Sequence, residues 1–329
     1  MNGKLIASSS PHIRSGETIS SIMRDVVIAL LPATLAGVYF FRLRAVMVIF
    51  FAVLSAMITE AVIQKIRKQD VTLNDWSAVV TGLLLALNIP AAAPWWMPIV
   101  GSVFAIAVVK QMFGGLGNNF MNPALAARAM LLASWPVQMT TWLAPVGHTV
   151  TTTATPSVMA SVGDAVTTAT PLAIISGGEG AGNILPTLTD LFIGNIGGCI
   201  GETSALALII GGIYLVYRGV ITPRIPVIYI ATVAVLTFGF GGFDPYFMTY
   251  QIFAGGLMLG AIYMATDYAS SPVTPRGQII FALGCGIITS IIRLYGGYPE
   301  GVSYAILLMN VASPLIDKYT GPRVFGEVK

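Results

Sequence analysis

Two copies of the string Thr-Thr-Ala-Thr-Pro lie in one stretch rich in Thr, Ala and Gly, at residues 152–156 and 167–171. A threonine hydroxyl can be esterified by a phosphate, and small neighbouring side chains let a modifying enzyme approach the backbone. The proline after the last threonine of each copy favours an extended conformation at that threonine, which presents its side chain. Thr155 and Thr170 are therefore two candidates for covalent modification.

Acidic residues within or beside apolar runs are candidates for ion coupling, because ionisable side chains are costly in lipid. Five residues qualify: Asp25, Glu60, Asp190, Glu202 and Asp267. The first two lie close in sequence to Arg24 and Lys65, so a role at a membrane boundary or in an ion pair is an equal alternative. Asp190, Glu202 and Asp267 flank Gly-rich or polar interruptions and are kept as the possible ion-coupling residues.

A Gly- and Asn-rich segment at 113–123 contains Asn118, Asn119 and Asn122, whose amides offer donors and acceptors to a ligand. Glycines there let the backbone approach such a ligand, but helix breaking and tight packing explain the same composition. No metal site is expected. Two isolated cysteines, Cys199 and Cys285, cannot by themselves supply a zinc or iron–sulfur site. They indicate helix packing, or a site shared with another subunit.

The composition indicates a protein solvated by lipid. Charged residues make up 9% and hydrophobic residues 55% of the 329 residues, whereas a soluble protein carries roughly 25% charged residues. The net charge of +3 reflects basic residues between apolar runs, and no nucleic-acid-binding motif accompanies them. The polar first twenty residues contain no signal-peptide core, so the first span is expected to direct insertion.

An all-α integral membrane fold of about ten helices follows, since a span needs about 20 apolar residues. The expected spans are 24–41, 45–64, 76–90, 94–112, 122–136, 187–217, 225–242, 247–266, 277–294 and 302–317. The sixth is unusually long and is interrupted at 194–198, which predicts a half-helix followed by a full span.

The distribution of Lys and Arg predicts the orientation. With the N-terminus inside, Arg42, Arg44 and Arg293 are the only basic residues on the outer side, and none occurs between Arg128 and Arg218. This asymmetry places both termini in the cytoplasm and the long loop outside.

Ten spans divide into two sets of five, and an odd number per set makes the second set inverted relative to the first. The expected organisation is a cytoplasmic segment at 1–23, a first repeat at 24–136, an external loop at 137–186, a second repeat at 187–317 and a cytoplasmic tail at 318–329. Uncharged loops of this length are uncommon without a function or disorder.

The loop also resembles a known modification motif. Asp164-x-x-Thr167-x-Ala169-Thr170 matches the pattern Asp-x-x-Ser/Thr-x-Ala-Thr, at which a flavin transferase attaches FMN to the last threonine through a phosphoester. In the first copy the acidic position is Thr149, so the resemblance selects Thr170 over Thr155.

The ten-span layout, the segment Gly114 to Ala124 and the N-terminal Ser9-Ser10-Pro11-His12 resemble the D subunit of the Rnf complex and the homologous B subunit of the sodium-pumping NADH:quinone reductase. The short N-terminal segment before the first span favours the Rnf type. This resemblance implies an electron relay in a bacterial inner membrane, within a translocase that moves electrons between ferredoxin and NAD and pumps Na⁺ or H⁺. It implies covalent FMN, a second noncovalent flavin (riboflavin) and, as partners, the A, B, C, E and G subunits of Rnf, above all the FMN-bearing G subunit.

Two alternatives stay open. Inverted five-span repeats also resemble urea-transporter-like folds, so a small-solute channel or transporter has the same layout. A structural subunit without a cofactor is the third interpretation. The chain has no nucleotide-binding fingerprint and no cluster-binding cysteine set, so it needs partner subunits to act on ferredoxin or NAD.

Overall fold

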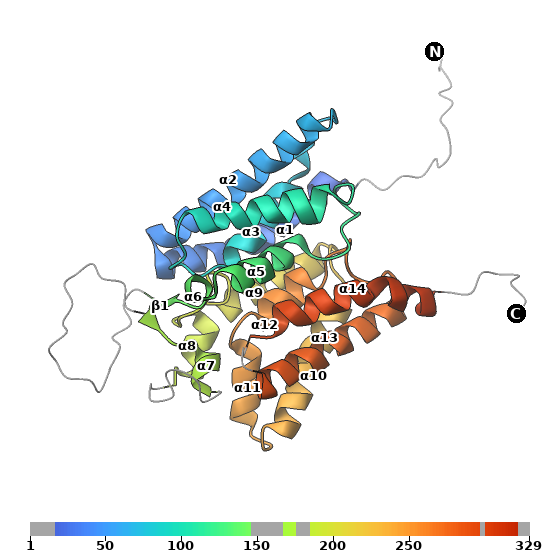
Figure 1. Cartoon of the computed structure of the whole chain (residues 1–329). Helices are drawn as coiled ribbons and strands as arrows, with labels where there is room; N and C mark the ends of the chain where they lie inside the picture. Colours follow the sequence, from blue (N-terminus) through green and yellow to red (C-terminus); the bar gives the residue numbers. More distant parts are fainter. Residues whose placement is uncertain (1–16, 146–166, 176–184, 297–299, 322–329) are drawn as a thin grey trace, which may run out of the picture.

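The fold is known from a computed structural model, which describes residues 17–145, 167–175, 185–296 and 300–321. These residues are mainly helical, as expected from the composition (Figure 1). In the view of Figure 1, α2 and α4 lie at the top, α10 and α11 at the bottom, and α5, α9 and α12 between them.

The first group of helices follows the first five predicted spans. Its elements are α1 (Ile19–Phe41), α2 (Leu43–Ile66), the short 3₁₀ turn η1 (Leu73–Asp75), α3 (Ser77–Leu87), α4 (Trp96–Val103), the π-helical segment η2 (Phe104–Gln111) and α5 (Pro123–Ser134). The helix starts carry the expected signals. Thr18 caps α1 through a reciprocal bond with Ser21, and Asn122 caps α5 directly before Pro123.

The connecting region contains α6 (Pro136–Met139), two short strands and α7 (Pro171–Ile175). Strand β1 (Trp142–Leu143) pairs antiparallel with β2 (Thr167–Thr168), so that Trp142 lies opposite Thr168. This two-residue ladder is the one pair of strands in the described residues. It fixes the threonine motif against the helices.

The second group consists of α8 (Leu188–Ile193), α9 (Ala205–Tyr217), α10 (Arg224–Phe240), α11 (Pro245–Phe253), α12 (Leu257–Leu259), the π-helical segment η3 (Gly260–Met264), α13 (Pro275–Tyr295) and α14 (Val302–Thr320). The predicted break in the sixth span is confirmed. Helix α8 ends at Gly194 in the left-handed conformation, and α9 begins only after Ser204, whose hydroxyl caps it.

By length and composition, α1, α2 and α13 can each cross a membrane, and the bent pair Pro245–Phe253 and Leu257–Met264 raises the number to four. The prediction of one continuous span at 247–266 is wrong, because this pair is bent by 63°. The chain passes through Ala254 with extended dihedrals and Gly255 with a positive φ of 69°, which interrupts helical hydrogen bonding.

Five further apolar helices have 10–17 residues: Ser77–Leu87, Trp96–Gln111, Pro123–Ser134, Ala205–Tyr217 and Arg224–Phe240. They coincide with predicted segments but are shorter than the about 20 residues of a straight span. The described helices thus support a multi-pass membrane protein, and the count of ten spans in two repeats stays a prediction.

The connecting elements gather at one end of the molecule. Figure 1 shows β1, α7 and α8 at the left, whereas α14 ends at the right. The threonine motif and the end of the last helix therefore lie at opposite ends of the bundle.

Candidate functional site

The threonine motif runs from the β1–β2 ladder into α7. Thr170 directly precedes α7, and its Oγ1 accepts a hydrogen bond of 3.2 Å from the backbone amide of Ala173. Only 8% of Thr170 is exposed. Leu172, two residues later, is buried among Leu191, Ile196 and other apolar side chains. Asp164 lies outside the described residues, so its relation to Thr170 stays a prediction.

A small cavity joins Thr170 to three segments that are distant in sequence. It is lined by Thr170, Pro171, Leu172, Ile196, Gly197, Gly198, Glu202, Gly255 and Glu300. Its volume is about 10 Å³, which is about the space of one water molecule. The motif therefore docks on the break between α8 and α9, beside two carboxylates.

Three buried polar atoms of the described residues have no hydrogen-bond partner: Thr168 Oγ1, Glu202 Oε1 and Tyr250 Oη. All three belong to residues around the docked motif. Thr168 is part of it, Glu202 lines the cavity, and Tyr250 packs in the same apolar cluster as Leu172. An unsatisfied buried polar group costs about 1–3 kcal/mol, so a polar partner from outside the described residues would stabilise this region.

The centre of the fold is a crossing of two interrupted segments. The chain after α3 and the chain after α8 meet in an antiparallel bridge between Pro90 and Cys199. Gly201 N donates to Leu87 O at 2.8 Å. A Cβ on Gly201 would lie 2.6 Å from Leu87 Cβ, so this contact requires glycine.

Arg128 of α5 ties this crossing to α14 from within the protein. Its Nη1 donates to Asn88 Oδ1 at 3.2 Å and to Ser303 Oγ at 3.0 Å, and its Nη2 forms an ion pair with Glu300. Nη1 also lies 3.4 Å from Glu202 Oε1. Arg128 is 3% exposed, so it lies inside the helix bundle and not in a solvent-exposed loop. Its charge is neutralised by glutamates instead of by water.

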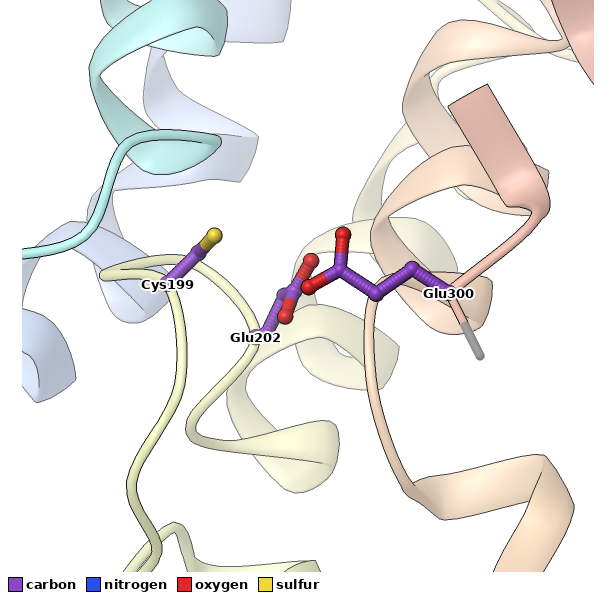
Figure 2. A group of neighbouring side chains, drawn as sticks. All are labelled: Cys199, Glu202 and Glu300. Atoms are coloured by element: carbon purple, nitrogen blue, oxygen red, sulfur yellow. The ribbon is translucent and has the colours of Figure 1, made fainter. Parts of the chain in front are cut away.

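Cys199, Glu202 and Glu300 form the acidic side of this cluster (Figure 2). One ligand atom from each lies within 4.8 Å of the others. The Cys199 thiol donates to Asn88 O at 3.2 Å, and Arg128 Nη2 lies 3.7 Å from its sulfur. Arg128 contacts all three groups, so within the described residues they form one buried polar network with a single cation. Cys285 is buried within α13, as packing predicts.

Arg293 was expected on the outer side of the membrane, but only 4% of it is exposed. Its Nη2 donates to Ala254 O at 3.2 Å, and its Nη1 donates to the backbone oxygen of Gln251. The bend between α11 and α12 frees these carbonyl groups, and Arg293 satisfies them. Neither Arg128 nor Arg293 could be placed from local sequence, because their partners come from distant segments.

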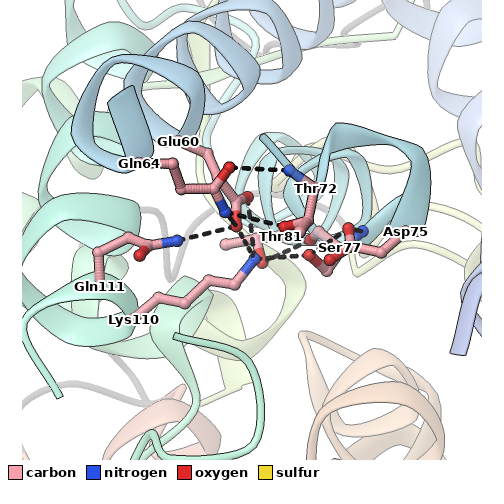
Figure 3. Close-up of polar contacts among 8 residues, drawn as sticks. All are labelled: Glu60, Gln64, Thr72, Asp75, Ser77, Thr81, Lys110 and Gln111. Carbon is pink, nitrogen blue, oxygen red and sulfur yellow. Dashed lines mark hydrogen bonds and ion pairs between the residues drawn. The ribbon is translucent and has the colours of Figure 1, made fainter. Parts of the chain in front are cut away.

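A second buried network surrounds Glu60 of α2 (Figure 3). Lys110 Nζ lies 2.8 Å from Glu60 Oε1 and donates to Ser77 Oγ at 2.6 Å. Gln111 Nε2 donates to Glu60 Oε1 at 2.9 Å. Glu60 is thus ion-paired, as one alternative predicted, but its partner is Lys110 of η2 instead of the neighbouring Lys65.

Asp25 likewise pairs with a distant residue and not with Arg24. Its carboxylate accepts from Tyr214 at 2.8 Å and from Arg218 at 3.1 Å, which joins α1 to the end of α9. Asp190 forms a capping box with Thr187 at the start of α8. The structure thus gives Asp25 a contact between two helices and Asp190 a local capping role.

A larger cavity of about 90 Å³ lies between the two groups of helices. Its polar lining comprises Ser77, Thr81, Lys110, Asn119, Asn122, Thr266, Asp267 and Tyr268, and its apolar lining comes mainly from α1, α3, α9 and the chain after it. Asn118 is exposed and is not among the lining residues.

Asn122 has its side chain occupied by structural contacts. Its Oδ1 accepts from two amides at the start of α5, and its Nδ2 donates to Met264 O at 3.4 Å. Asp267 accepts from Ser270 Oγ at 3.1 Å. The structure therefore brings Asn119, Asn122 and Asp267 together at one cavity, and places Glu202 at the other.

Comparisons with known proteins identify the family. The family described as NQR2, RnfD, RnfE matches residues 6–326. The chain belongs to this family. The family resemblance expected from the span layout, the segment Gly114 to Ala124 and the N-terminal Ser9-Ser10-Pro11-His12 is confirmed.

Several relatives match over nearly their whole length. The chain is 57% identical to the D subunit of a Na(+)-translocating ferredoxin:NAD(+) oxidoreductase complex from Acetobacterium woodii, covering 99% of this chain and 96% of the relative. It is 46% identical to the D subunit of a proton-translocating complex of the same kind from Clostridium ljungdahlii, covering 97% and 95%. The D subunit of an ion-translocating oxidoreductase complex from Halorhodospira halophila is 37% identical, with 97% and 95% covered.

Proposed function

We propose that the chain is the membrane electron-relay subunit of an ion-translocating ferredoxin:NAD⁺ oxidoreductase complex. Covalent FMN on Thr170 passes electrons between redox centres of partner subunits, and this transfer is coupled to Na⁺ or H⁺ transport. The relatives at 57% and 46% identity are the D subunits of such complexes. The observation that supports the flavin assignment is the position of the motif threonine in one cavity with Glu202, whose Oε1 accepts no hydrogen bond from any described residue.

The residues around Thr170 fit a phosphoester-linked flavin in their chemistry. Thr170 carries a hydroxyl, and Gly197 and Gly198 line the same cavity. Thr168, Glu202 and Tyr250 retain hydrogen-bonding capacity for the polar parts of the group. The cavity holds about one water molecule and is lined by the carboxylates of Glu202 and Glu300, which repel a phosphate, so the phosphate and the ring would lie outside it. When bound, the flavin supplies one- and two-electron chemistry, and the chain positions it and sets the surrounding charge.

The noncovalent riboflavin implied by the family is proposed for the larger cavity. This cavity combines apolar walls with a few converging polar groups, which is typical of cofactor sites. Asn119 and Asp267 would hold the polar edge of the ring, and Asn122 would position the start of α5. Asn118 is exposed and is not proposed as a contact.

Two inverted five-helix repeats, at 24–136 and 187–317, are proposed for the membrane domain. The proposal is supported by a shared sequence of elements. In each group a π-helical segment is followed by a turn and by a helix with Pro at its first position, α5 in one group and α13 in the other. The loop at 137–186 is proposed to lie outside, facing the FMN-bearing G subunit, with both termini in the cytoplasm of a bacterial inner membrane.

Ion coupling is proposed for Glu202 and Asp267 rather than for Asp190, which caps a helix. Both lie at breaks between helices, where membrane transporters place their binding groups. The remaining partners, the A, B, C and E subunits, supply the ferredoxin- and NAD-reactive centres that this chain lacks, and the flavin transferase loads Thr170.

Covalent flavin is tested by in-gel fluorescence. The full-length chain is produced together with a flavin transferase, denatured and separated on a gel. Wild type is expected to give a fluorescent band that is lost in Thr170→Ala. The matched control is Thr155→Ala, in the near-copy of the motif that lacks the aspartate, and its band should persist. A wild-type band without fluorescence would show that the relay proposal is wrong and would favour a cofactor-free channel or scaffold.

A further inference from the structure

Arg128 lies between the larger and the smaller of the two cavities described above. Helix α5 begins at the larger cavity, which is lined by Pro123 and Ala124, and Arg128 follows Ala124 by about one turn. On its other side the guanidinium contacts Glu202 and Glu300, which line the smaller cavity. The side chain of Arg128 therefore connects the lining of one cavity with the lining of the other.

Helix α1 shows that the two cavities lie at different depths. Its first turns line the larger cavity through Ile22 and Val26. Its Gly37 packs on Ile200, in the break between α8 and α9 that supplies Glu202 to the smaller cavity. The stretch from Val26 to Gly37 rises about 16 Å along the helix axis. Since α1 is long and apolar enough to cross a membrane, the cavities are separated along the direction of crossing.

A row of polar side chains on α3 leads from the larger cavity to Arg128. Ser77 and Thr81 line this cavity. Asn88, two turns after Thr81 at the end of the helix, accepts a hydrogen bond of 3.2 Å from Arg128 Nη1. Residues at these spacings share one face of a helix. Polar groups therefore continue from one cavity to the other, and Arg128 lies at the centre of the row.

The partners of Arg128 are oxygen atoms of the kind that bind small hard cations. Nη1 donates to the amide oxygen of Asn88 and to the hydroxyl of Ser303, and Nη2 pairs with the Glu300 carboxylate. Glu202 supplies a second carboxylate, 3.4 Å from Nη1, and Figure 2 shows it beside Glu300. The guanidinium is always charged and takes these oxygens at once, so a free cation can bind them only where the guanidinium is absent.

We propose that Arg128 acts as a tethered cation that blocks the passage of Na⁺ between the two cavities. A cation at Asp267 in the larger cavity, or at Glu202 in the smaller one, meets a fixed positive charge whose oxygen ligands are already occupied. Like charges repel strongly where the dielectric constant is low, and membrane pores use arginine to exclude cations. The inference rests on the proposed place of the chain in an ion-translocating complex, whose gradient a leak through this chain would dissipate.

The block is tested by the passive uptake of radioactive Na⁺ into proteoliposomes that contain the full-length chain, produced with the flavin transferase. Wild type is expected to take up Na⁺ no faster than liposomes without protein. Arg128→Ala should increase the uptake by about tenfold or more, because removing a buried unit charge lowers the barrier to a cation by more than one tenfold step in rate. The matched control is Arg218→Ala, which removes an arginine whose side chain is 50% exposed, and it should stay as tight as wild type.

Free guanidinium ion separates an opened passage from a damaged protein. It has the charge and the planar shape of the missing group, so millimolar guanidinium chloride should reduce the Na⁺ uptake of Arg128→Ala to the wild-type level. The same concentration of choline chloride should not, and a neutral dye enclosed in the vesicles should be retained. Uptake that guanidinium does not reduce, or that comes with loss of the dye, would overturn the inference, because the leak would then be unspecific.

A second variant covers the loss of stability expected for Arg128→Ala, which leaves two buried carboxylates without their cation. Combining it with Glu300→Gln removes one of these charges, and this double variant should also admit Na⁺ and be blocked by guanidinium. A double variant that shows a cooperative melting transition but is as tight as wild type would contradict the block by Arg128. Wild type that takes up Na⁺ as fast as Arg128→Ala would contradict it as well.

Failure of the proposed function gives a different result in the same vesicles. In-gel fluorescence of the reconstituted wild type reports the covalent flavin on Thr170. A fluorescent band together with equally low Na⁺ uptake in wild type and Arg128→Ala would overturn the block by Arg128 alone. A band without fluorescence would overturn the electron relay, whatever the Na⁺ uptake.

Discussion

Arg128 is the residue on which the buried charges at the central crossing depend. It is 3% exposed and contacts Glu202, Glu300, Asn88 and Ser303, which come from separate segments. Removing one partner of a buried pair leaves an uncompensated charge and costs about 3–5 kcal/mol. We therefore expect Arg128→Ala to lower the melting temperature of the detergent-solubilised protein strongly.

The control for Arg128 is Arg218, which pairs with Asp25 but whose side chain is 50% exposed. Water replaces the lost contact there, so Arg218→Ala should change the melting temperature much less. Similar losses in the two variants would contradict the view that burial makes the Arg128 contacts matter.

The cost of an unpaired buried charge can also be measured at Lys110, with a double-mutant cycle. Its ion pair with Glu60 is 2% exposed on each side, so Lys110→Met alone leaves a buried carboxylate and should destabilise by about 3–5 kcal/mol. The double variant Lys110→Met with Glu60→Gln has no unpaired charge and should recover much of this loss. Thermal unfolding of the four proteins gives the coupling, and additive losses would show that the two side chains act independently.

At the scale of elements, the docking of the segment 167–175 controls access to Thr170. Leu172 is 2% exposed and packs among Leu191, Ile196 and Tyr250. Leu172→Ala removes this anchor and leaves a cavity, which costs about 2–5 kcal/mol of local or global stability. We expect a maleimide to label Thr170→Cys slowly, and much faster when Leu172→Ala is added.

The matched control for the labelling is Leu208→Ala, a buried leucine of α9 outside this cluster. It should leave the labelling rate of Thr170→Cys unchanged. Rapid labelling of Thr170→Cys without any second change would show that the segment does not stay docked.

Gly201 tests the crossing of the two broken segments. A Cβ at this position would lie 2.6 Å from Leu87 Cβ and 3.0 Å from Leu87 O. Gly201→Ala must therefore push apart the two segments that meet at the Pro90–Cys199 bridge. Overpacking of this kind costs about 1–3 kcal/mol. Gly239 of α10 has nothing near its Cβ position among the described residues, and Gly239→Ala should be neutral or slightly stabilising. The test compares the melting temperatures of the two variants. Equal changes would show that the close approach of Gly201 to Leu87 does not explain the destabilisation.

For the whole molecule, apolar runs predicted where helices lie, because every span must present apolar side chains to lipid. The predicted segments coincide with α1 to α5 and α8 to α14, and the Gly-rich break after α8 was predicted from composition. The bend at Ala254–Gly255 was not predicted, because a single Gly-Gly pair within an apolar run is common at helix contacts. The burial of Arg128 and Arg293 was not predicted, because charge counting assigns Arg and Lys to loops, whereas their partners are distant glutamates for Arg128 and distant backbone carbonyls for Arg293.

Contacts between residues that are distant in sequence also limited what could be predicted about the candidate site. Thr170 was selected by its local motif, and Glu202 by its place beside a break. Glu300 and Arg128 were not singled out, since nothing nearby in sequence marks them. Only the folded chain brings Thr170, Glu202 and Glu300 to one cavity and pairs both glutamates with Arg128.

Orientation in the membrane is the last property that belongs to the whole molecule. The threonine motif and the end of α14 lie at opposite ends of the bundle (Figure 1), and the segment between Arg128 and Arg218 contains no basic residue. Since basic residues are retained on the cytoplasmic side, the loop should face outward and the end of α14 inward. We expect a membrane-impermeant thiol reagent added to intact cells to label Thr155→Cys but not Lys329→Cys, and to label both after the cells are opened. The native Cys199 and Cys285 are fully buried, so the wild-type chain serves as the unlabelled control. Labelling of Lys329→Cys in intact cells would reverse the orientation and place Thr170 on the side where a G subunit outside the membrane cannot reach it.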